Sequence, residues 1–222
     1  SDSTSKLSRE HAVSSPVRGL TVIAGGKYTT YRVMGKDAVD AAVHGLERTV
    51  PESCTERVPL VGADGYVGAY NSRQLTADRS GLSVSKIEHL LGRYGTLCEE
   101  LLELIAEQPA LGDPLTSAAE YLKAEGYYAV SHEGALHLED VLTRRTRISI
   151  EVPDRGDAAA REVADIIAPL LGWTPEQADR EVEHYRLRVK AERESQEQPD
   201  DHTADAARLG APEVRLGAAA TA

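Results

Sequence analysis

The sequence predicts a mainly α protein, in which a short N-terminal β-hairpin and one helix precede an irregular helical bundle. Three observations indicate this fold class. A β-branched apolar run at residues 20–24 follows a Ser-Ser-Pro turn signal, which is typical of a hairpin. Apolar side chains recur at helical spacing over residues 29–46, as in a half-buried helix. Beyond residue 83 the Ser/Thr-x-x-Glu pattern of the capping box recurs, which predicts several helix starts.

The N-terminal part is expected to form a strand–turn–strand–helix unit. Partial alternation at residues 7–13 predicts a short strand, and Ser, Pro and Gly at residues 14–19 predict a turn. The second strand, at residues 20–24, leads into a pair of glycines and then into the helix. Residues 1–48 are therefore taken as one segment.

Residues 49–82 are expected to connect two domains. They hold Pro51, Pro59 and several glycines, and their apolar periodicity is weak. Gly62, Gly65 and Gly68 lie three residues apart, whereas the dinucleotide-binding motif requires GxGxxG before a helix. We therefore interpret this segment as a loop and not as a phosphate-binding turn.

Residues 83–194 are expected to form about five helices packed as an irregular bundle. Capping boxes begin at Ser85, Thr96 and Ser117, and Thr174 is followed by proline at the first helical position. Residues 195–222 are rich in Ala, Gly, Pro and acidic residues without clear periodicity. We expect this tail to be disordered.

Composition indicates a globular protein outside the nucleic-acid-binding and membrane-spanning classes. The 222 residues carry a net charge of -11, which disfavours a nucleic-acid partner. No apolar run approaches the ~18 residues that span a bilayer, and the first six residues lack a secretory pattern. The two cysteines do not indicate a disulfide framework. We expect a cytoplasmic location.

The stretch from Gly25 to Arg32, with the sequence GGKYTTYR, is the strongest candidate for a binding site. Glycines allow the backbone to approach a ligand closely. The unpaired amides of a helix's first turn, together with its dipole, favour a negative charge. Lys27 adds a cation where the dipole disfavours one, and a bound anion would remove that penalty.

This octet resembles the last strand–turn–helix of the FAD domain in FAD-dependent glycerol-3-phosphate dehydrogenases. Residues 132–147, with the sequence HEGALHLEDVLTRRTR, resemble the helical C-terminal domain of the same family. Both matches occur in the family's order, and the resemblance covers about residues 1–194. It implies that residues 1–48 end a FAD-binding α/β domain. It also implies that the protein oxidises sn-glycerol 3-phosphate to dihydroxyacetone phosphate with FAD as hydride acceptor.

The resemblance also implies roles for particular residues. Gly25, Gly26, Lys27, Tyr28, Thr29 and Thr30 would contact the flavin, where backbone amides stabilise negative charge on the reduced ring. Lys27 and Arg9 would contribute catalytic cations near the substrate, with Arg9 binding the substrate phosphate. Independently of the family, Thr29 and Thr30 are natural helix caps, and the two roles are compatible.

The resemblance is partial, because no Rossmann GxGxxG fingerprint is present. The chain therefore looks like the last part of such an enzyme, inactive alone, whose partner is the missing N-terminal half of the FAD domain. Electrons would pass to a quinone or another acceptor, with peripheral attachment to the inner membrane face as one option. Two alternatives stay open: a glycerol-3-phosphate oxidase that uses oxygen, and a non-catalytic helical interaction module.

The remaining candidates have structural interpretations. His11 is expected to be merely polar. His132 and His137 are five residues apart, which does not align two metal ligands on one helix face, so no metal site is predicted. The basic cluster Arg144, Arg145 and Arg147 is expected to pair with acids such as Glu139 and Asp140, or to brace the helical domain against the FAD domain.

Overall fold

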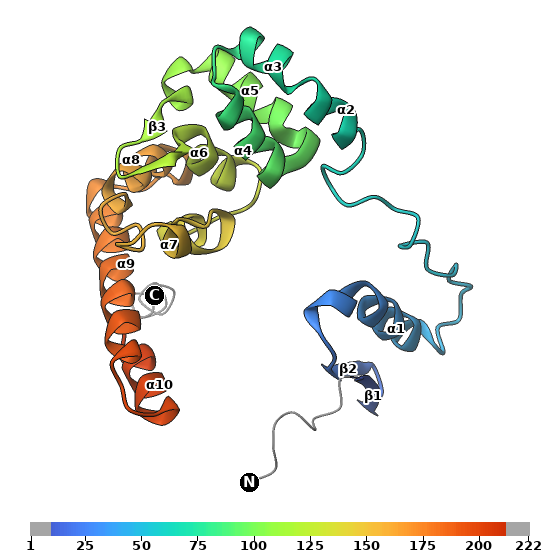
Figure 1. The fold of residues 1–222 in the computed structure, drawn as a ribbon. Coiled ribbons are helices and arrows are strands. Elements are labelled where there is room, and N and C mark those ends of the chain that lie inside the picture. The colour runs from blue at the N-terminus through green and yellow to red at the C-terminus, as the bar shows by residue number, and fades with distance from the viewer. Residues whose placement is uncertain (1–9, 212–222) are drawn as a thin grey trace. The chain divides into compact units, whose positions relative to one another are not determined.

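The computed structural model describes residues 10–211, and these form two compact units that divide between Asp64 and Gly65 (Figure 1). The first unit is a β-hairpin with one helix, and the second is a bundle of helices with one small hairpin. The mainly α fold with an N-terminal hairpin, as predicted, is confirmed. No helix in residues 10–211 is both long and apolar enough to cross a bilayer.

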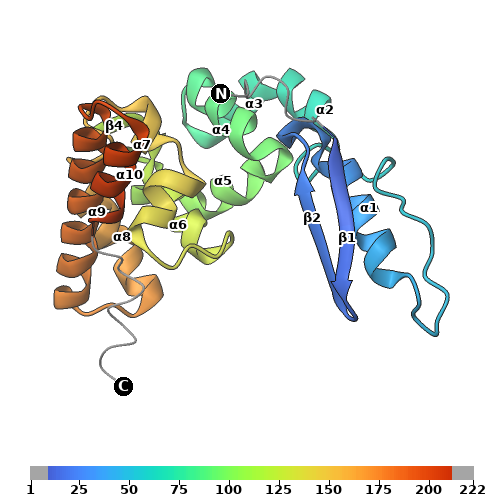
Figure 2. The same cartoon turned by 90° about the horizontal axis from the view of Figure 1, so that it is seen from below.

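In the first unit, strands β1 (His11–Val17) and β2 (Leu20–Gly25) pair antiparallel (Figure 2). The hairpin closes through Arg18 and Gly19, whose φ of +84° suits glycine. The Ser-Ser-Pro segment, predicted as the turn, lies within β1 and causes only a shift in register before Val17. Proline is tolerated there because a two-stranded sheet leaves an edge on each strand.

The hairpin continues through a short 3-10 helix (Tyr28–Thr30) into α1 (Tyr31–Val43). His11 Nε2 lies 2.8 Å from Asp37 Oδ2, which ties β1 to α1. No residue of this unit among residues 10–64 is fully buried, and Val17, Val39 and Leu46 are about half exposed or more. The unit therefore has no closed core of its own.

The second unit contains nine α-helices in residues 65–211. They are α2 (Tyr66–Asn71), α3 (Arg73–Ser80), α4 (Val84–Tyr94), α5 (Cys98–Glu107), α6 (Lys123–Ser131), α7 (Ile148–Glu151), α8 (Ala160–Leu171), α9 (Pro175–Gln196) and α10 (Asp201–Leu209). Strands β3 (Pro114–Leu115) and β4 (Ala118–Leu122) form a small hairpin, and residues Asp140–Arg145 form a π-helix.

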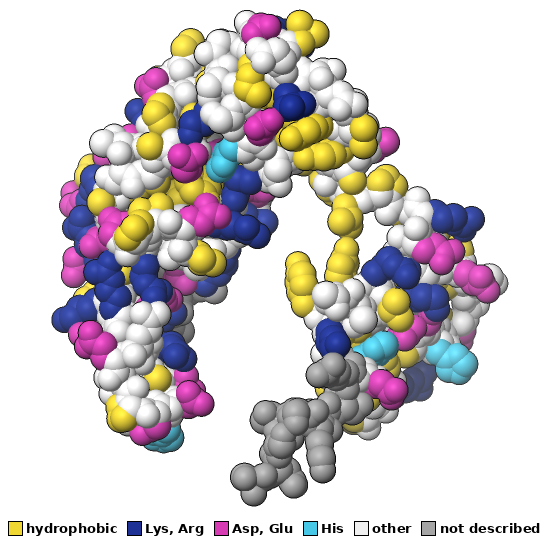
Figure 3. Space-filling model, in the orientation of Figure 1, with side chains coloured by type: hydrophobic (Ala, Val, Ile, Leu, Met, Phe, Trp, Pro, Cys, Tyr) yellow, Lys and Arg dark blue, Asp and Glu magenta, His cyan; other side chains and the backbone are white. Residues whose placement is uncertain are grey.

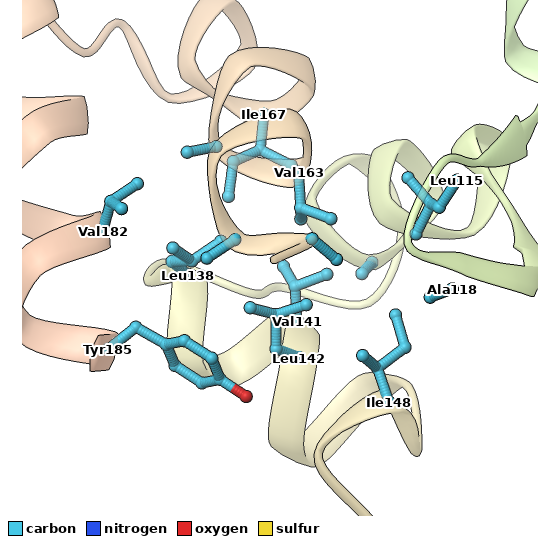
Figure 4. Close-up of a cluster of buried hydrophobic side chains, with 14 of the residues drawn as sticks. Leu115, Ala118, Leu138, Val141, Leu142, Ile148, Val163, Ile167, Val182 and Tyr185 are labelled. Atoms are coloured by element: carbon cyan, nitrogen blue, oxygen red, sulfur yellow. The ribbon is translucent and has the colours of Figure 1, made fainter. Parts of the chain in front are cut away.

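Two hydrophobic cores hold this unit together. One joins α4, α5 and α6 around Ile87, Leu90 and Leu101, none of which is accessible to solvent. The other joins the π-helix, α8 and α9 around Val141, Val163 and other apolar side chains that point toward one another in Figure 4. Helices α4, α5 and α8 each bury apolar side chains at helical spacing.

Several local expectations are corrected by the structure. The capping box predicted at Ser85 lies inside α4, which Ser83 caps instead, and Thr96 lies in a 3-10 turn before α5 and does not cap it. Residues 66–80, predicted as part of the connector, form α2 and α3. The pattern at Ser117 does not start a helix, because residues 118–122 instead pair as β4 with Leu115 and Pro114. Tertiary pairing overrides the local capping signal here.

The start of the predicted disordered tail is helical. Thr203 N donates to Asp200 Oδ1 at 2.9 Å, which caps α10. The helix folds back against the end of α9 (Figure 2), and buries Ala204 there. Arg208 Nε also donates to Ser195 Oγ at 3.1 Å. These contacts offset the entropy of ordering a segment whose composition suggested disorder. Residues 212–222 lie outside the described residues.

Candidate functional site

The candidate site is the turn between β2 and α1. Gly25 and Gly26 have φ values of +79° and +80°, which residues with a side chain rarely adopt. A Cβ on Gly25 would lie 2.9 Å from Glu10 O, and one on Gly26 would lie 2.6 Å from Met34 Sδ. The fold itself therefore requires glycine at both positions, and their presence does not depend on a ligand.

Lys27 and Thr30 close the turn that follows. Thr30 N donates to Lys27 O at 3.0 Å, and Thr30 Oγ1 donates to the same carbonyl at 2.9 Å. Lys27 N donates to Thr30 Oγ1 at 3.4 Å. Thr30 thus closes the turn back onto Lys27, but its side chain accepts no hydrogen bond from the first turn of α1, so the predicted capping of that helix by Thr30 is wrong.

The next two amides are uncommitted. Within the described part of the chain, neither Tyr28 N nor Thr29 N has a hydrogen-bond acceptor. Both residues are exposed, and the Tyr28 side chain is 90% accessible. Such first-turn amides, next to a helix start, form a natural site for negative charge.

The Lys27 side chain is exposed and makes no ion pair with any residue in the range 10–211. The turn therefore presents two amide donors and one ammonium on an open face. The predicted cofactor-binding residues Gly25 to Thr30 are contiguous on this turn. The second predicted catalytic residue, Arg9, lies outside the described residues.

The other candidates have separate partners. His11 belongs to the ion pair with Asp37, a partner 26 residues away that sequence reasoning missed because no local spacing links the two. His137 Nδ1 lies 2.8 Å from Glu181 Oε1, whereas His132 stacks on Tyr128.

Arg144 pairs as predicted, because its guanidinium donates to Glu139 at 2.7 Å and to Asp140 at 3.1 Å. Sequence reasoning missed Arg93, which donates from Nη2 to Arg145 O at 2.6 Å. Arg93 comes from α4, and its only sequence signal was a basic residue near the end of a helix.

Several known proteins are similar to this chain over more than half of its length. Residues 53–178 match the family model described as the C-terminal domain of alpha-glycerophosphate oxidase. The glycerol-3-phosphate dehydrogenase of Mycobacterium leprae is 58% identical over 215 residues, which is 97% of this chain and 37% of that protein. Glycerol-3-phosphate dehydrogenase 2 of Mycobacterium tuberculosis is 55% identical over the same shares.

A more distant relative is the probable mitochondrial glycerol-3-phosphate dehydrogenase of Dictyostelium discoideum, which is 32% identical over 85% of this chain and 29% of its own length. The chain spans little more than a third of the length of the mycobacterial relatives. Because the family model matches residues 53–178, more than half of the chain, the chain belongs to the family of the alpha-glycerophosphate oxidase C-terminal domain.

Proposed function

We propose that this chain is the C-terminal part of a flavoprotein that oxidises sn-glycerol 3-phosphate to dihydroxyacetone phosphate. The observation that carries the proposal is the open turn at Gly25–Thr30, in a chain whose relatives are named glycerol-3-phosphate dehydrogenases. FAD, when bound, would supply the hydride acceptor, and the electrons would then pass to a quinone or another acceptor.

The residues of the turn fit one end of such a cofactor. The amides of Tyr28 and Thr29 have no acceptor among the described residues, and they would donate to a ring edge that gains negative charge on reduction. Donors held in place beforehand stabilise developing charge without reorganising. Gly25 and Gly26 shape this backbone through their positive φ values, and Thr30 holds it through three hydrogen bonds with Lys27.

Lys27 would supply a positive charge beside the substrate. Its side chain is exposed and has no ion-pair partner among the described residues, so it is free to meet an anion. Arg9 would bind the substrate phosphate with its planar fork. The role of Arg9 rests on the resemblance alone.

The lack of buried residues in the first unit supports a partner segment that covers it. No residue among positions 10–64 is buried, and the apolar side chains of Val17, Leu20 and Val39 are about half exposed. Isolated apolar residues on a surface are normal, but a unit with no core is not stable alone. We therefore propose that the preceding half of a FAD domain covers this hairpin and helix.

The test is acceptor-linked oxidation of glycerol 3-phosphate by the complete polypeptide that contains this chain. Lys27→Ala should lower kcat/KM by about tenfold or more, equivalent to about 1.4 kcal/mol of transition-state stabilisation. Lys36→Ala is the matched control, because Lys36 lies on α1 in the same unit and its ion pairs among residues 10–211 are with its own helix neighbours Asp37 and Asp40. Equal turnover in the two variants would remove Lys27 from the proposal.

A glycerol-3-phosphate oxidase is the second candidate, and the family description favours it, because that description names alpha-glycerophosphate oxidase. Substrate-dependent formation of hydrogen peroxide under air would identify the oxidase, whereas activity only with an added quinone would identify the dehydrogenase.

The third candidate is a non-catalytic helical module. The two closed cores of the second unit support it, because they do not involve the turn. The module would be favoured if the purified complete polypeptide shows no flavin absorbance and gains none when it is reconstituted with FAD.

A further inference from the structure

The second unit carries a basic pocket in an otherwise acidic chain. The pocket has a volume of about 340 Å³, at the lower end of the ~300–1,000 Å³ typical of small-molecule sites. Figure 3 shows basic side chains gathered beside a histidine between α4 and α7. The charged and titratable residues that line the pocket are His89, Arg93, Arg144, Arg145, Arg147 and Glu151. Four guanidinium groups and one carboxylate thus line the pocket, and two of the four, Arg93 and Arg144, already pair with carboxylates outside the lining.

Arg93 forms a fixed wall of this pocket. Its guanidinium lies over the Tyr121 ring at 5.2 Å from the centroid. Its Nε lies 3.2 Å from Glu125 Oε2, and its Nη2 donates to Arg145 O. The side chain is only 17% exposed. These contacts hold one positive charge, and the backbone of Arg145, in place before any ligand arrives.

Arg145 and Arg147 are the available cations. The Arg145 side chain is exposed and makes no ion pair within residues 10–211. Arg147 is 71% exposed, and its one carboxylate neighbour, Glu151, lies at 4.0 Å. Glu133 acts on Arg145 from farther away, and burial raises the pKa of that carboxyl.

The backbone that carries these arginines is unusual. Asp140–Arg145 form a π-helix, which ends where Thr146 N donates to Val141 O at 2.9 Å. π-Helical turns are rare and occur frequently at functional sites. Here the wider turn is held by Thr146, which is only 3% exposed and whose Oγ1 also donates to Val141 O. It places consecutive arginines at the rim of the pocket.

We propose that this arginine pocket binds a small phosphate-bearing anion, with Arg145 and Arg147 as the contacts and Arg93 as the fixed wall. Guanidinium groups suit the task because their paired N–H groups match two phosphate oxygens. The inference goes beyond the proposed function, because the pocket lies entirely in the second unit and uses no residue of the Gly25–Thr30 turn.

The test is isothermal titration calorimetry of the full chain with inorganic phosphate, and then with glycerol 3-phosphate. We expect saturable binding at one site. Arg145→Ala should weaken it at least tenfold, and Arg145→Lys should give a smaller loss because the charge stays while the fork is lost. Arg180→Ala is the matched control, since Arg180 is exposed on α9 and has no ion pair among the described residues. Thermal unfolding of each variant checks that it remains folded.

Two results would overturn the proposal. One is the absence of saturable phosphate binding by the unaltered chain at millimolar concentrations. The other is an equal loss in Arg145→Ala and Arg180→Ala, which would mean that only overall charge matters. Lys27→Ala separates this site from the turn, because it should leave phosphate binding intact. If Lys27→Ala abolishes binding and Arg145→Ala does not, the phosphate belongs to the turn.

Discussion

The buried carboxylate of Glu125 offers the sharpest test of how the second unit is held together. Its side chain is 1% exposed. Its oxygens lie 2.9 Å and 3.1 Å from His89 Nε2, 3.2 Å from Arg93 Nε and 3.2 Å from the Tyr94 hydroxyl. Leu122 N also donates to it at 2.9 Å, which completes the cap of α6. Three side chains of α4 and the backbone N–H of Leu122, at the end of β4, therefore depend on one carboxylate.

Glu125→Ala leaves Arg93 without its partner and Leu122 N without its acceptor. Removing one partner of a buried ion pair costs about 3–5 kcal/mol. In a domain of 150–250 residues, each kcal/mol lowers Tm by about 2–4 °C, so a loss of about 4 kcal/mol corresponds to roughly 8–16 °C. Glu125→Gln should lose less, because an amide oxygen still accepts from Leu122 N.

The assay is urea or thermal unfolding of the full chain, followed by the tyrosine and tryptophan signals of the second unit. Glu120→Ala is the control, because Glu120 is on the adjacent strand, its side chain is 87% exposed, and it lies 3.9 Å from Lys86. We expect that control to change stability by less than about 0.5 kcal/mol. A loss below about 1 kcal/mol in Glu125→Ala would refute the reasoning, since it would mean that Arg93 finds water or another partner.

Two further predictions concern the turn and the cysteines. Gly25→Ala should destabilise the hairpin by about 1–3 kcal/mol, because its φ is +79° and a Cβ would meet Glu10 O at 2.9 Å. Gly35→Ala, where a Cβ would meet open space on α1, should instead stabilise this unit by up to about 1 kcal/mol. Amide hydrogen exchange of the first unit in the complete polypeptide measures the stability change of both variants. Burial raises the pKa of the Cys98 thiol to about 12, so it stays protonated at pH 8 and should react slowly with a thiol reagent. The exposed Cys54 should react fast, and equal rates for the two thiols would contradict the burial argument.

Much of the fold follows from local pattern. Residues 20–24 were predicted as a strand and lie within β2, and Thr174, which was noted for the proline that follows it, caps α9 by accepting from Gln177 N. Such signals act within a few residues of chain, so they can be read without knowing the fold. The family resemblance rested on two local motifs, and the match over residues 53–178 confirms it.

The errors share a cause. Ser117 began a capping-box pattern but precedes a strand, because Leu115 and Ala118 face each other in a hairpin. The tail was predicted as disordered from composition, yet α10 is stabilised by Asp200 and by contact with α9. In both cases a neighbouring element supplies part of the stabilising contact, β3 for β4 and α9 for α10, and composition and capping patterns do not encode that contact.

The amino-acid sequence by itself determined the class of the protein and the turn at Gly25–Thr30, because glycine conformation, helix periodicity and capping act over short distances. Only the tertiary structure decided which charges meet. Arg93 reaches Arg145 across 52 residues, and Glu125 joins His89 across 36. Such pairs form only when packing of the apolar faces brings distant helices together, because hydrophobic burial is non-directional and leaves no spacing rule for the polar groups that it brings into contact.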